Sequence, residues 1–231
     1  MAVSIGAMQW RAQSADDDML ATSQNEEAIA DLEEIDNADR DISASQDQNQ
    51  YPARVENDSF VIGSPDAPIT ILEFSSFSCP HCATFHKNTL SDLKNDYVDS
   101  GKVKFVFNDF PLNGAAVKAS LLMKCVDVEN RYDFMEMLFE QQSQWAFESD
   151  YQTRLKQYAS LLGISNDTAE SCMNDTATEQ AMFTKMRANN EKYKVQSTPT
   201  FVILPSEKII TGAQPYGVFS TEIERLLKEV N

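Results

Sequence analysis

From residue 59 onward, the spacing of apolar positions predicts strands near both ends of the sequence and helices between them. Short runs of β-branched or aromatic residues, bounded by glycine, proline or serine, are typical of strands. Apolar residues at helical spacing over 219–230 predict a closing helix. Strands and helices mixed in this way favour the α/β fold class. The predicted strands are residues 60–62, 69–74, 102–107, 201–204 and 209–211.

A long block between these strands, residues 114–194, has no strand-like run and holds several helical patterns. Because strands precede and follow the block, we expect an all-helical subdomain inserted into one α/β domain over residues 59–231. The predicted helices of the block are residues 115–126, 132–142, 151–162, 166–173 and 176–193.

The sequence Cys79-Pro80-His81-Cys82 follows the predicted strand 69–74 and precedes a run with helical spacing. Proline suits the first position of a helix. The N–H groups and partial positive charge of a helix N-terminus stabilise a thiolate at Cys79, and His81 adds to this as a donor or as an imidazolium. Two thiols at this spacing form a reversible dithiol/disulfide pair. We expect Cys79 to be the exposed nucleophile and Cys82 the more buried, resolving thiol.

Two other interpretations of this cysteine pair carry less weight. Half of a zinc site would need a second pair of ligands, and the other cysteines, Cys125 and Cys172, stand singly. A purely structural bridge over so short a loop stabilises little. We therefore expect no metal, and since no glycine-rich phosphate loop is present, no nucleotide cofactor.

Cys125 and Cys172 both fall in the predicted helical block and have two interpretations of their own. A disulfide between them would restrict the unfolded chain by roughly 4 kcal/mol and would favour an oxidising compartment. Alternatively, they are two buried free thiols. We favour the structural disulfide.

A proline also stands directly before the predicted strand 201–204, in Ser197-Thr198-Pro199-Thr200. Alone, it suits the start of a strand. Combined with a strand, a CxxC pair and a helix upstream, it resembles the cis-proline loop of the thioredoxin fold. With Leu72-Glu73-Phe74, Phe77 and the Cys-Pro-His-Cys sequence, residues 58–231 resemble the DsbA family of bacterial thiol:disulfide oxidoreductases.

The resemblance implies a thioredoxin-like fold with an inserted helical subdomain, acting on cysteines of periplasmic protein clients without a cofactor. It implies that Cys79, Cys82, His81 and Pro80 form the catalytic centre and that Thr198 and Pro199 bind the client backbone. A second protein would reoxidise or reduce the pair. Cys-Pro-His-Cys resembles the oxidases, whereas Thr-Pro resembles the isomerases of the family, so both directions stay open. A chaperone-like protein that binds clients without redox chemistry is the alternative.

Two charged positions near the cysteines have open interpretations. Glu73 lies within an apolar strand, where it would either point to solvent or, as the resemblance implies, accept a proton beneath Cys82. His86 lies one turn beyond Cys82, and we expect it at the surface or in a groove rather than in catalysis.

Residues 1–58 differ from the rest because they are strongly acidic, with fourteen acidic and three basic residues. Within 15–45, Ala28, Leu32, Ile35 and Ile42 form a narrow apolar stripe that predicts a helix. So short a helix needs a surface to pack on. We expect a homo-oligomer through residues 15–45; an acidic tail or packing on its own domain are the alternatives.

The overall charge and hydropathy narrow the range of partners. A formal net charge of -17 makes nucleic acid an improbable partner. No apolar run has the length of a membrane span, so we expect none. The apolar start at residues 1–8 lacks the basic segment of a signal peptide.

Overall fold

The structure is a computed structural model that describes residues 51–230. Contacts divide the chain into Met1–Asp47 and Gln48–Asn231, and the second unit holds all the elements below. The predicted oligomerisation stripe lies outside the described residues. Within residues 51–230, no helix combines the length and the apolarity needed to cross a bilayer.

A six-stranded sheet in the order β1-β2-β4-β3-β5-β6 forms the centre of the domain. Strands β3 and β4 are parallel, and all other neighbours are antiparallel. The mixed α/β fold is confirmed, because this sheet and its helices make a thioredoxin fold with a helical insertion. The strands are β1 Arg54–Glu56, β2 Ser59–Ile62, β3 Ile69–Ser75, β4 Val103–Asp109, β5 Thr200–Leu204 and β6 Lys208–Thr211.

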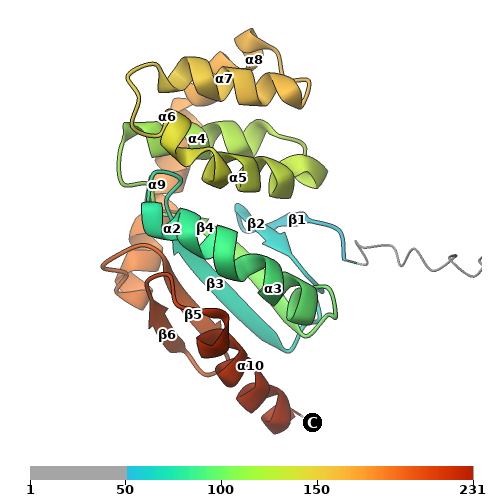
Figure 1. The fold of residues 1–231 in the computed structure, drawn as a ribbon. Helices are drawn as coiled ribbons and strands as arrows, with labels where there is room; N and C mark the ends of the chain where they lie inside the picture. The colour runs from blue at the N-terminus through green and yellow to red at the C-terminus, as the bar shows by residue number, and fades with distance from the viewer. Residues whose placement is uncertain (1–50, 231) are drawn as a thin grey trace, which may run out of the picture. The chain divides into compact units, whose positions relative to one another are not determined.

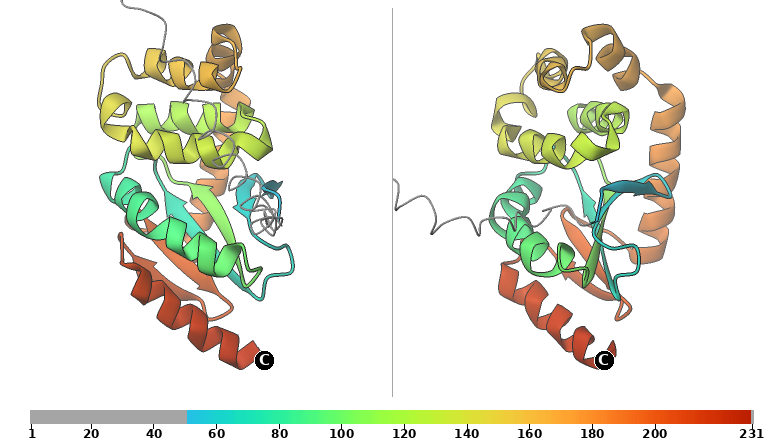
Figure 2. Two further views of the ribbon diagram at one scale, coloured as in Figure 1. Left: turned by 45° about the vertical axis from the view of Figure 1, so that its right-hand side comes forward. Right: turned by 90° about the vertical axis from the view of Figure 1, so that its right-hand side faces the viewer.

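One helical stretch follows β3 and changes its winding along its length. It runs from Pro80 to Val98 as α2 Pro80–Phe85, η1 His86–Leu90, α3 Ser91–Leu93 and η2 Lys94–Val98, where η1 and η2 are π-helical. This stretch and α10 (Tyr216–Val230) cover one face of the sheet, and α9 (Thr176–Tyr193) covers the other (Figures 1 and 2).

The alternation of side chains along β3 decides what lies beneath α2. Ile69, Ile71 and Glu73 share the face covered by α2 and α10, where the two isoleucines belong to one apolar cluster with Phe85 of α2. Phe74 points to the opposite face and packs on Tyr193 of α9. Glu73 is therefore carried into the core by a strand whose preceding residues on that face, Ile69 and Ile71, are apolar.

The inserted helices form a separate layer over one end of the sheet, close to the start of α2 (Figure 1). They are α4 Gly114–Cys125, η3 Val128–Asn130, α5 Arg131–Glu140, α6 Gln142–Trp145, α7 Tyr151–Leu161 and α8 Asn166–Met173, followed by α9. The predicted helix 132–142 is in fact α5 and α6, which meet at Gln141.

The predicted start of the domain at residue 59 is too late. Strand β1 pairs with β2 and so belongs to the sheet. It was missed because its sequence, Arg-Val-Glu, has a single apolar residue and no alternation to detect.

Candidate active site

The two cysteines of the CxxC pair lie where β3 passes into α2. Cys79 is the N-cap of α2 and Pro80 its first residue, as predicted. The N–H of Cys79 donates to the Ser76 carbonyl oxygen at 3.0 Å, which closes the turn between strand and helix. Both cysteines are free thiols.

The loop before β5 covers the Cys79 sulfur. The Thr198–Pro199 peptide bond is cis, and the Cys79 Sγ donates to the Thr198 carbonyl oxygen at 3.3 Å. Cys79 is only 5% exposed, so the prediction of an exposed nucleophile is wrong. Only the fold brings this loop, over a hundred residues downstream, against the sulfur. The predicted order still holds, because Cys82 is fully buried.

Cys79 is surrounded by groups that favour its thiolate. A hydrogen bond from Cys82 lowers the pKa of Cys79 to about 5; Thr198 and the backbone N–H groups of Cys82 and His81 add to this, against the effect of burial. The Thr198 hydroxyl acts on this sulfur, is buried, and makes no hydrogen bond of ordinary length and angle among the described residues. His81 contributes its backbone, while its side chain is exposed.

Cys82 has the opposite environment. Burial, the hydrogen bond to Cys79 and the negative charge of Glu73 all raise the pKa of the Cys82 thiol. Glu73 has no exposed surface, which decides between its two interpretations in favour of the buried one. The two sulfurs therefore differ in protonation, and Cys79 is the one able to attack or to leave as a thiolate.

His86 lies in the core beside Glu73, so the prediction that it lies at the surface or in a groove is wrong. Its Nε2 is 3.1 Å from Glu73 Oε1, and its Nδ1 is 2.8 Å from Glu136 Oε1. Burial lowers the pKa of His86, but the charge of Glu73 and the bond to Glu136 outweigh it and raise this pKa to about 9. The ring also stacks on Phe139 at 3.9 Å between centroids.

Gln142 of α6 supports the active-site turn and was missed by the sequence analysis. Its Nε2 donates to the Phe77 carbonyl at 2.8 Å and to the Cys79 carbonyl at 3.0 Å. The side chain is 5% exposed, and the Cys79 carbonyl accepts a second hydrogen bond from the Ala83 N–H at 3.1 Å. A glutamine in a polar run such as Gln141-Gln142-Ser143-Gln144 gives no signal for this role.

The second cysteine pair lies away from this centre. Cys125, at the end of α4, and Cys172, in α8, are joined by a disulfide. Cys125 is exposed and Cys172 buried. Within residues 51–230, no group of three or more His, Cys, Asp and Glu side chains is arranged to hold a metal ion.

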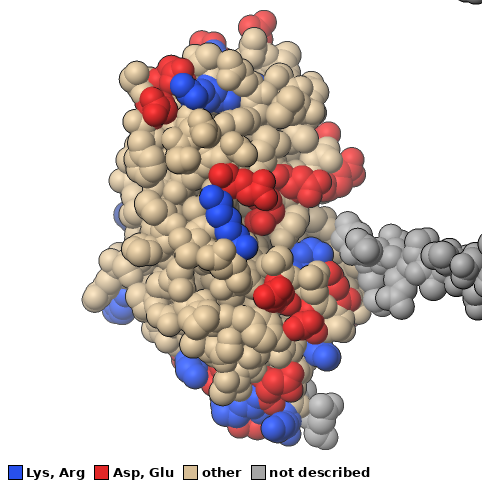
Figure 3. All heavy atoms as spheres, in the orientation of Figure 1, with Lys and Arg blue, Asp and Glu red and all other residues tan. Residues whose placement is uncertain are grey.

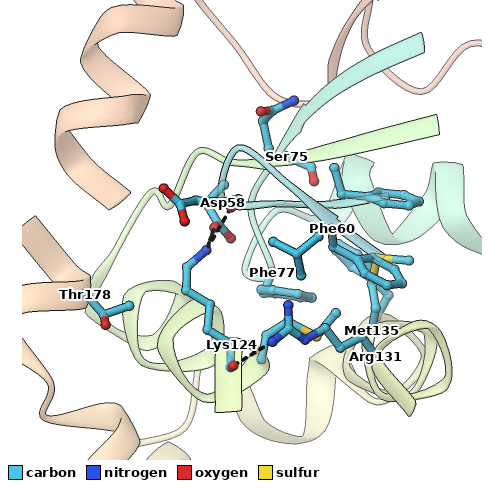
Figure 4. Close-up of a pocket in the computed structure, with 14 residues that line it drawn as sticks. Asp58, Phe60, Ser75, Phe77, Lys124, Arg131, Met135 and Thr178 are labelled. Atoms are coloured by element: carbon cyan, nitrogen blue, oxygen red, sulfur yellow. Dashed lines mark hydrogen bonds and ion pairs between the residues drawn. The ribbon is translucent and has the colours of Figure 1, made fainter. Parts of the chain in front are cut away.

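A cavity of about 280 Å³ lies beside Phe77, two positions before Cys79 in the chain (Figure 4). Phe60, Phe77 and Met135 line its apolar side, and Lys124 and Arg131 line its helical side. Neither cysteine of the CxxC pair lines it. The two sulfurs that are expected to react therefore lie outside this cavity.

Comparison with known proteins places this geometry in a family. The family described as Thioredoxin matches residues 55–225. The disulfide bond formation protein D of Bacillus subtilis is 31% identical over 173 residues, which is 73% of this chain and 77% of that protein. The crystal structure of Wolbachia pipientis alpha-DsbA1 is similar with a TM-score of 0.71 and 25% identity, over 76% of this chain and 94% of that one.

The chain belongs to the thioredoxin family and, within it, to the DsbA-like disulfide oxidoreductases. A Rickettsia felis protein named as a protein-disulfide oxidoreductase is 24% identical over 76% of this chain. The match spans only 63% of that relative's length.

Proposed function

We propose that this protein exchanges disulfides with cysteines of protein clients in the periplasm, through Cys79 and Cys82 and without a cofactor. The observation that carries the proposal is the difference between the two thiols. The pKa of Cys79 is lowered to about 5, while that of Cys82 is raised by burial, the bond to Cys79 and the charge of Glu73. A stable Cys79 thiolate favours the reduced protein and makes its disulfide oxidising.

In the oxidising direction, a client thiolate attacks the Cys79 sulfur of the Cys79–Cys82 disulfide. The S–S bond breaks, and Cys82 leaves and takes a proton from Glu73, the buried carboxyl group beside it. A second client thiolate then attacks the client sulfur of the mixed disulfide and releases Cys79 as its thiolate. The client loses two electrons and the protein's disulfide gains them, so a separate redox partner must restore the disulfide.

The surface around the turn suits an extended client. Thr198 and Pro199 would pair with the client backbone beside Cys79. Leu112, whose N–H donates to Ser76 Oγ, is 56% exposed, and Phe147, just beyond α6, is 62% exposed. The surface over the start of α2 is mostly uncharged, whereas acidic side chains gather over α5 (Figure 3). Client segments that carry apolar residues beside the cysteine would bind best.

The reduction potential of the pair tests the direction of exchange. Equilibration of the full chain with glutathione, followed by alkylation and mass measurement, gives this potential. A reduction potential of about -120 mV supports an oxidase, and a reduction potential of about -270 mV supports a reductant. A pair that does not equilibrate with glutathione at all would refute the proposed function.

An isomerase is the second candidate, favoured by Thr198 before the cis-proline and by the apolar stripe in residues 15–45. Several subunits would then enclose a client with wrong disulfides. Light scattering on the full chain and on a Leu32→Asp/Ile35→Asp variant tests this, with Glu34→Gln as the control. If the full chain, the double variant and the control all have the mass of a monomer, the homo-oligomer is refuted. If the full chain and the double variant refold a client with scrambled disulfides equally well, the apolar stripe does not serve isomerisation.

The chaperone-like alternative predicts that Cys79→Ser still protects a client from aggregation and still supports growth of the source cells. Loss of growth support with retained protection would favour the redox function. Fractionation of those cells tests the proposed periplasmic location.

A further inference from the structure

Glu73, His86 and Glu136 form a connected row of ionisable groups that begins beneath Cys82 and ends at the surface. His86 contacts one carboxylate with each ring nitrogen, at 3.1 Å to Glu73 and 2.8 Å to Glu136. The side chains of Glu73, His86 and Glu136 are 0%, 1% and 23% exposed. The row therefore leads from a fully buried carboxyl group to one that water reaches.

At the inner end of the row, one of the two carboxylate oxygens of Glu73 makes no hydrogen bond among the described residues. Glu73 Oε1 is taken by His86, whereas Glu73 Oε2 is buried and has no hydrogen-bond partner among the described residues. The charge of Glu73 acts on Cys82. A buried carboxylate oxygen without a donor lacks one of the hydrogen bonds it needs, and a proton from Cys82 would supply it.

The middle of the row favours a doubly protonated ring in the reduced protein. A nitrogen that faces a carboxylate must carry a proton to donate, so two such contacts require an imidazolium. The charge of Glu73 also acts on two further titratable groups, Cys82 on the helix of His86 and Tyr132 on α5. Burial first, and nearby negative charges second, raise the pKa of Tyr132, which keeps its hydroxyl neutral. The remaining neighbours are the rings of Phe85, Phe107 and Phe139.

We propose that His86 and Glu136 are positioning residues that exchange a proton with water whenever Glu73 exchanges one with Cys82. This deepens the proposed function and rests on it. In the disulfide form, Glu73 is the neutral acid and His86 is neutral, with its proton on Nε2. When Cys82 leaves the disulfide, Glu73 Oε2 gives it a proton, and His86 Nδ1 takes a proton from water by way of Glu136.

The same exchange runs backwards when Cys82 attacks a mixed disulfide. The Cys82 proton goes to Glu73 Oε2, and the Nδ1 proton of His86 goes to Glu136 and then to water. The net charge of the three groups is minus one before and after each step. The buried region therefore gains or loses no net charge, because the charges on Glu73 and His86 appear and disappear as an opposite pair.

The protonation of His86 in the two redox forms tests this directly by nitrogen NMR of the full chain. The chain has two histidines, so a His81→Gln variant assigns both signals. At pH 7.5 we expect His86 to be protonated on both nitrogens in the dithiol form and on one in the disulfide form. The same protonation in both forms would overturn the proposal. This measurement needs only added dithiothreitol as reductant or ferricyanide as oxidant, so it is valid even if the protein exchanges with neither a client nor glutathione.

Kinetics of the resolving step give a second test. A glutathione mixed disulfide on Cys79 is prepared at low pH, and release of glutathione is followed as pH is raised. We expect release at pH 7 to slow about 10-fold in Glu136→Gln and about 100-fold in His86→Gln. Glu140→Gln, an exposed carboxylate one turn further along α5, is the control and should stay within about two-fold.

The use of both Glu136→Gln and His86→Gln lets the kinetic test give a result even if one variant does not fold. Glu136 is partly exposed, so its variant should fold even if His86→Gln does not. Unchanged release and an unchanged pH profile in Glu136→Gln would overturn the proposal. If the wild-type protein instead fails to exchange with glutathione at any pH, the proposed function fails, whereas the NMR result still decides the proton exchange.

Discussion

The two cysteine pairs of this domain show how the surroundings, and not the thiol itself, decide what a cysteine does. Cys79 and Cys82 are close in sequence, unjoined and held in opposite protonation states. Cys125 and Cys172 lie 47 positions apart on two helices and are joined. A reversible bond needs thiols that differ in acidity, whereas a stabilising bond needs a long loop to restrict. One domain supplies both environments.

Removal of the Cys79 sulfur is the change with the largest expected effect. Cys79→Ser should reduce exchange with a client disulfide to the uncatalysed rate, because serine is no nucleophile towards sulfur at neutral pH. The measurement is the rate of reduction of a disulfide client. Cys82→Ser should instead trap a mixed disulfide on Cys79, visible as an added mass. If Cys79→Ser keeps the wild-type rate, another thiol carries the reaction.

The acidity of Cys79 can be measured by the ultraviolet absorbance of its thiolate in the reduced protein. We expect a midpoint near pH 5 rather than the ordinary 9.0. Because the pKa of Cys79 is lowered on folding, its contribution to stability is complete above about pH 9 and is lost as pH falls towards 5. Reduced protein should therefore lose more stability than oxidised protein between pH 8 and pH 5.

A Thr198→Val variant sharpens the titration, since it removes the hydroxyl beside the sulfur. The midpoint should rise, and Ser206→Ala, in the turn after β5, should leave it unchanged. A wild-type midpoint near 9 would remove the distinction between the two thiols.

Loss of the second pair should change stability and leave exchange intact. Replacement of both Cys125 and Cys172 by serine should lower the free energy of unfolding by roughly 4 kcal/mol, from the long loop that the bond closes. Denaturant unfolding measures this, and wild-type protein treated with dithiothreitol is the control. A loss below about 1 kcal/mol would mean that the bond does little for the fold.

Gln142→Ala should have the smallest effect of these changes. It removes a donor from the Phe77 and Cys79 carbonyl oxygens, of which the Cys79 oxygen keeps the Ala83 N–H, and this lowers stability by about 1–3 kcal/mol. Because one of them belongs to Cys79, exchange should also slow. Gln144→Ala, exposed and two positions away, should change stability by less than about 0.5 kcal/mol. Equal stability of the two variants would show that the turn does not depend on α6.

Local patterns predicted most elements, because apolar spacing records which face of a strand or helix is buried. Helices α8 and α9 begin and end where their spacing indicated, and the CxxC pair stands at the predicted junction of strand and helix. Contacts between segments that are distant in the sequence were harder to predict. The cover over Cys79 comes from Thr198, and the burial of His86 depends on Glu136 of α5.

One signal for the burial of His86 was nevertheless present. Glu73 shares its strand face with Ile69 and Ile71, and a buried carboxylate needs a partner. His86 is one turn beyond Cys82 on the helix that packs on that face. Gln142 offered no such signal, since nothing in its neighbourhood distinguishes it from Gln141 and Gln144.

The order of the strands has a consequence for synthesis on the ribosome. Strand β3 pairs with β4, which emerges soon after it, but its other neighbour, β5, emerges only after the whole helical block. A nascent chain that ends within residues 114–194 therefore presents one edge of β3 with unpaired peptide groups and apolar side chains. Such an edge recruits strands from other chains. We expect chaperones to shield the growing polypeptide during that interval.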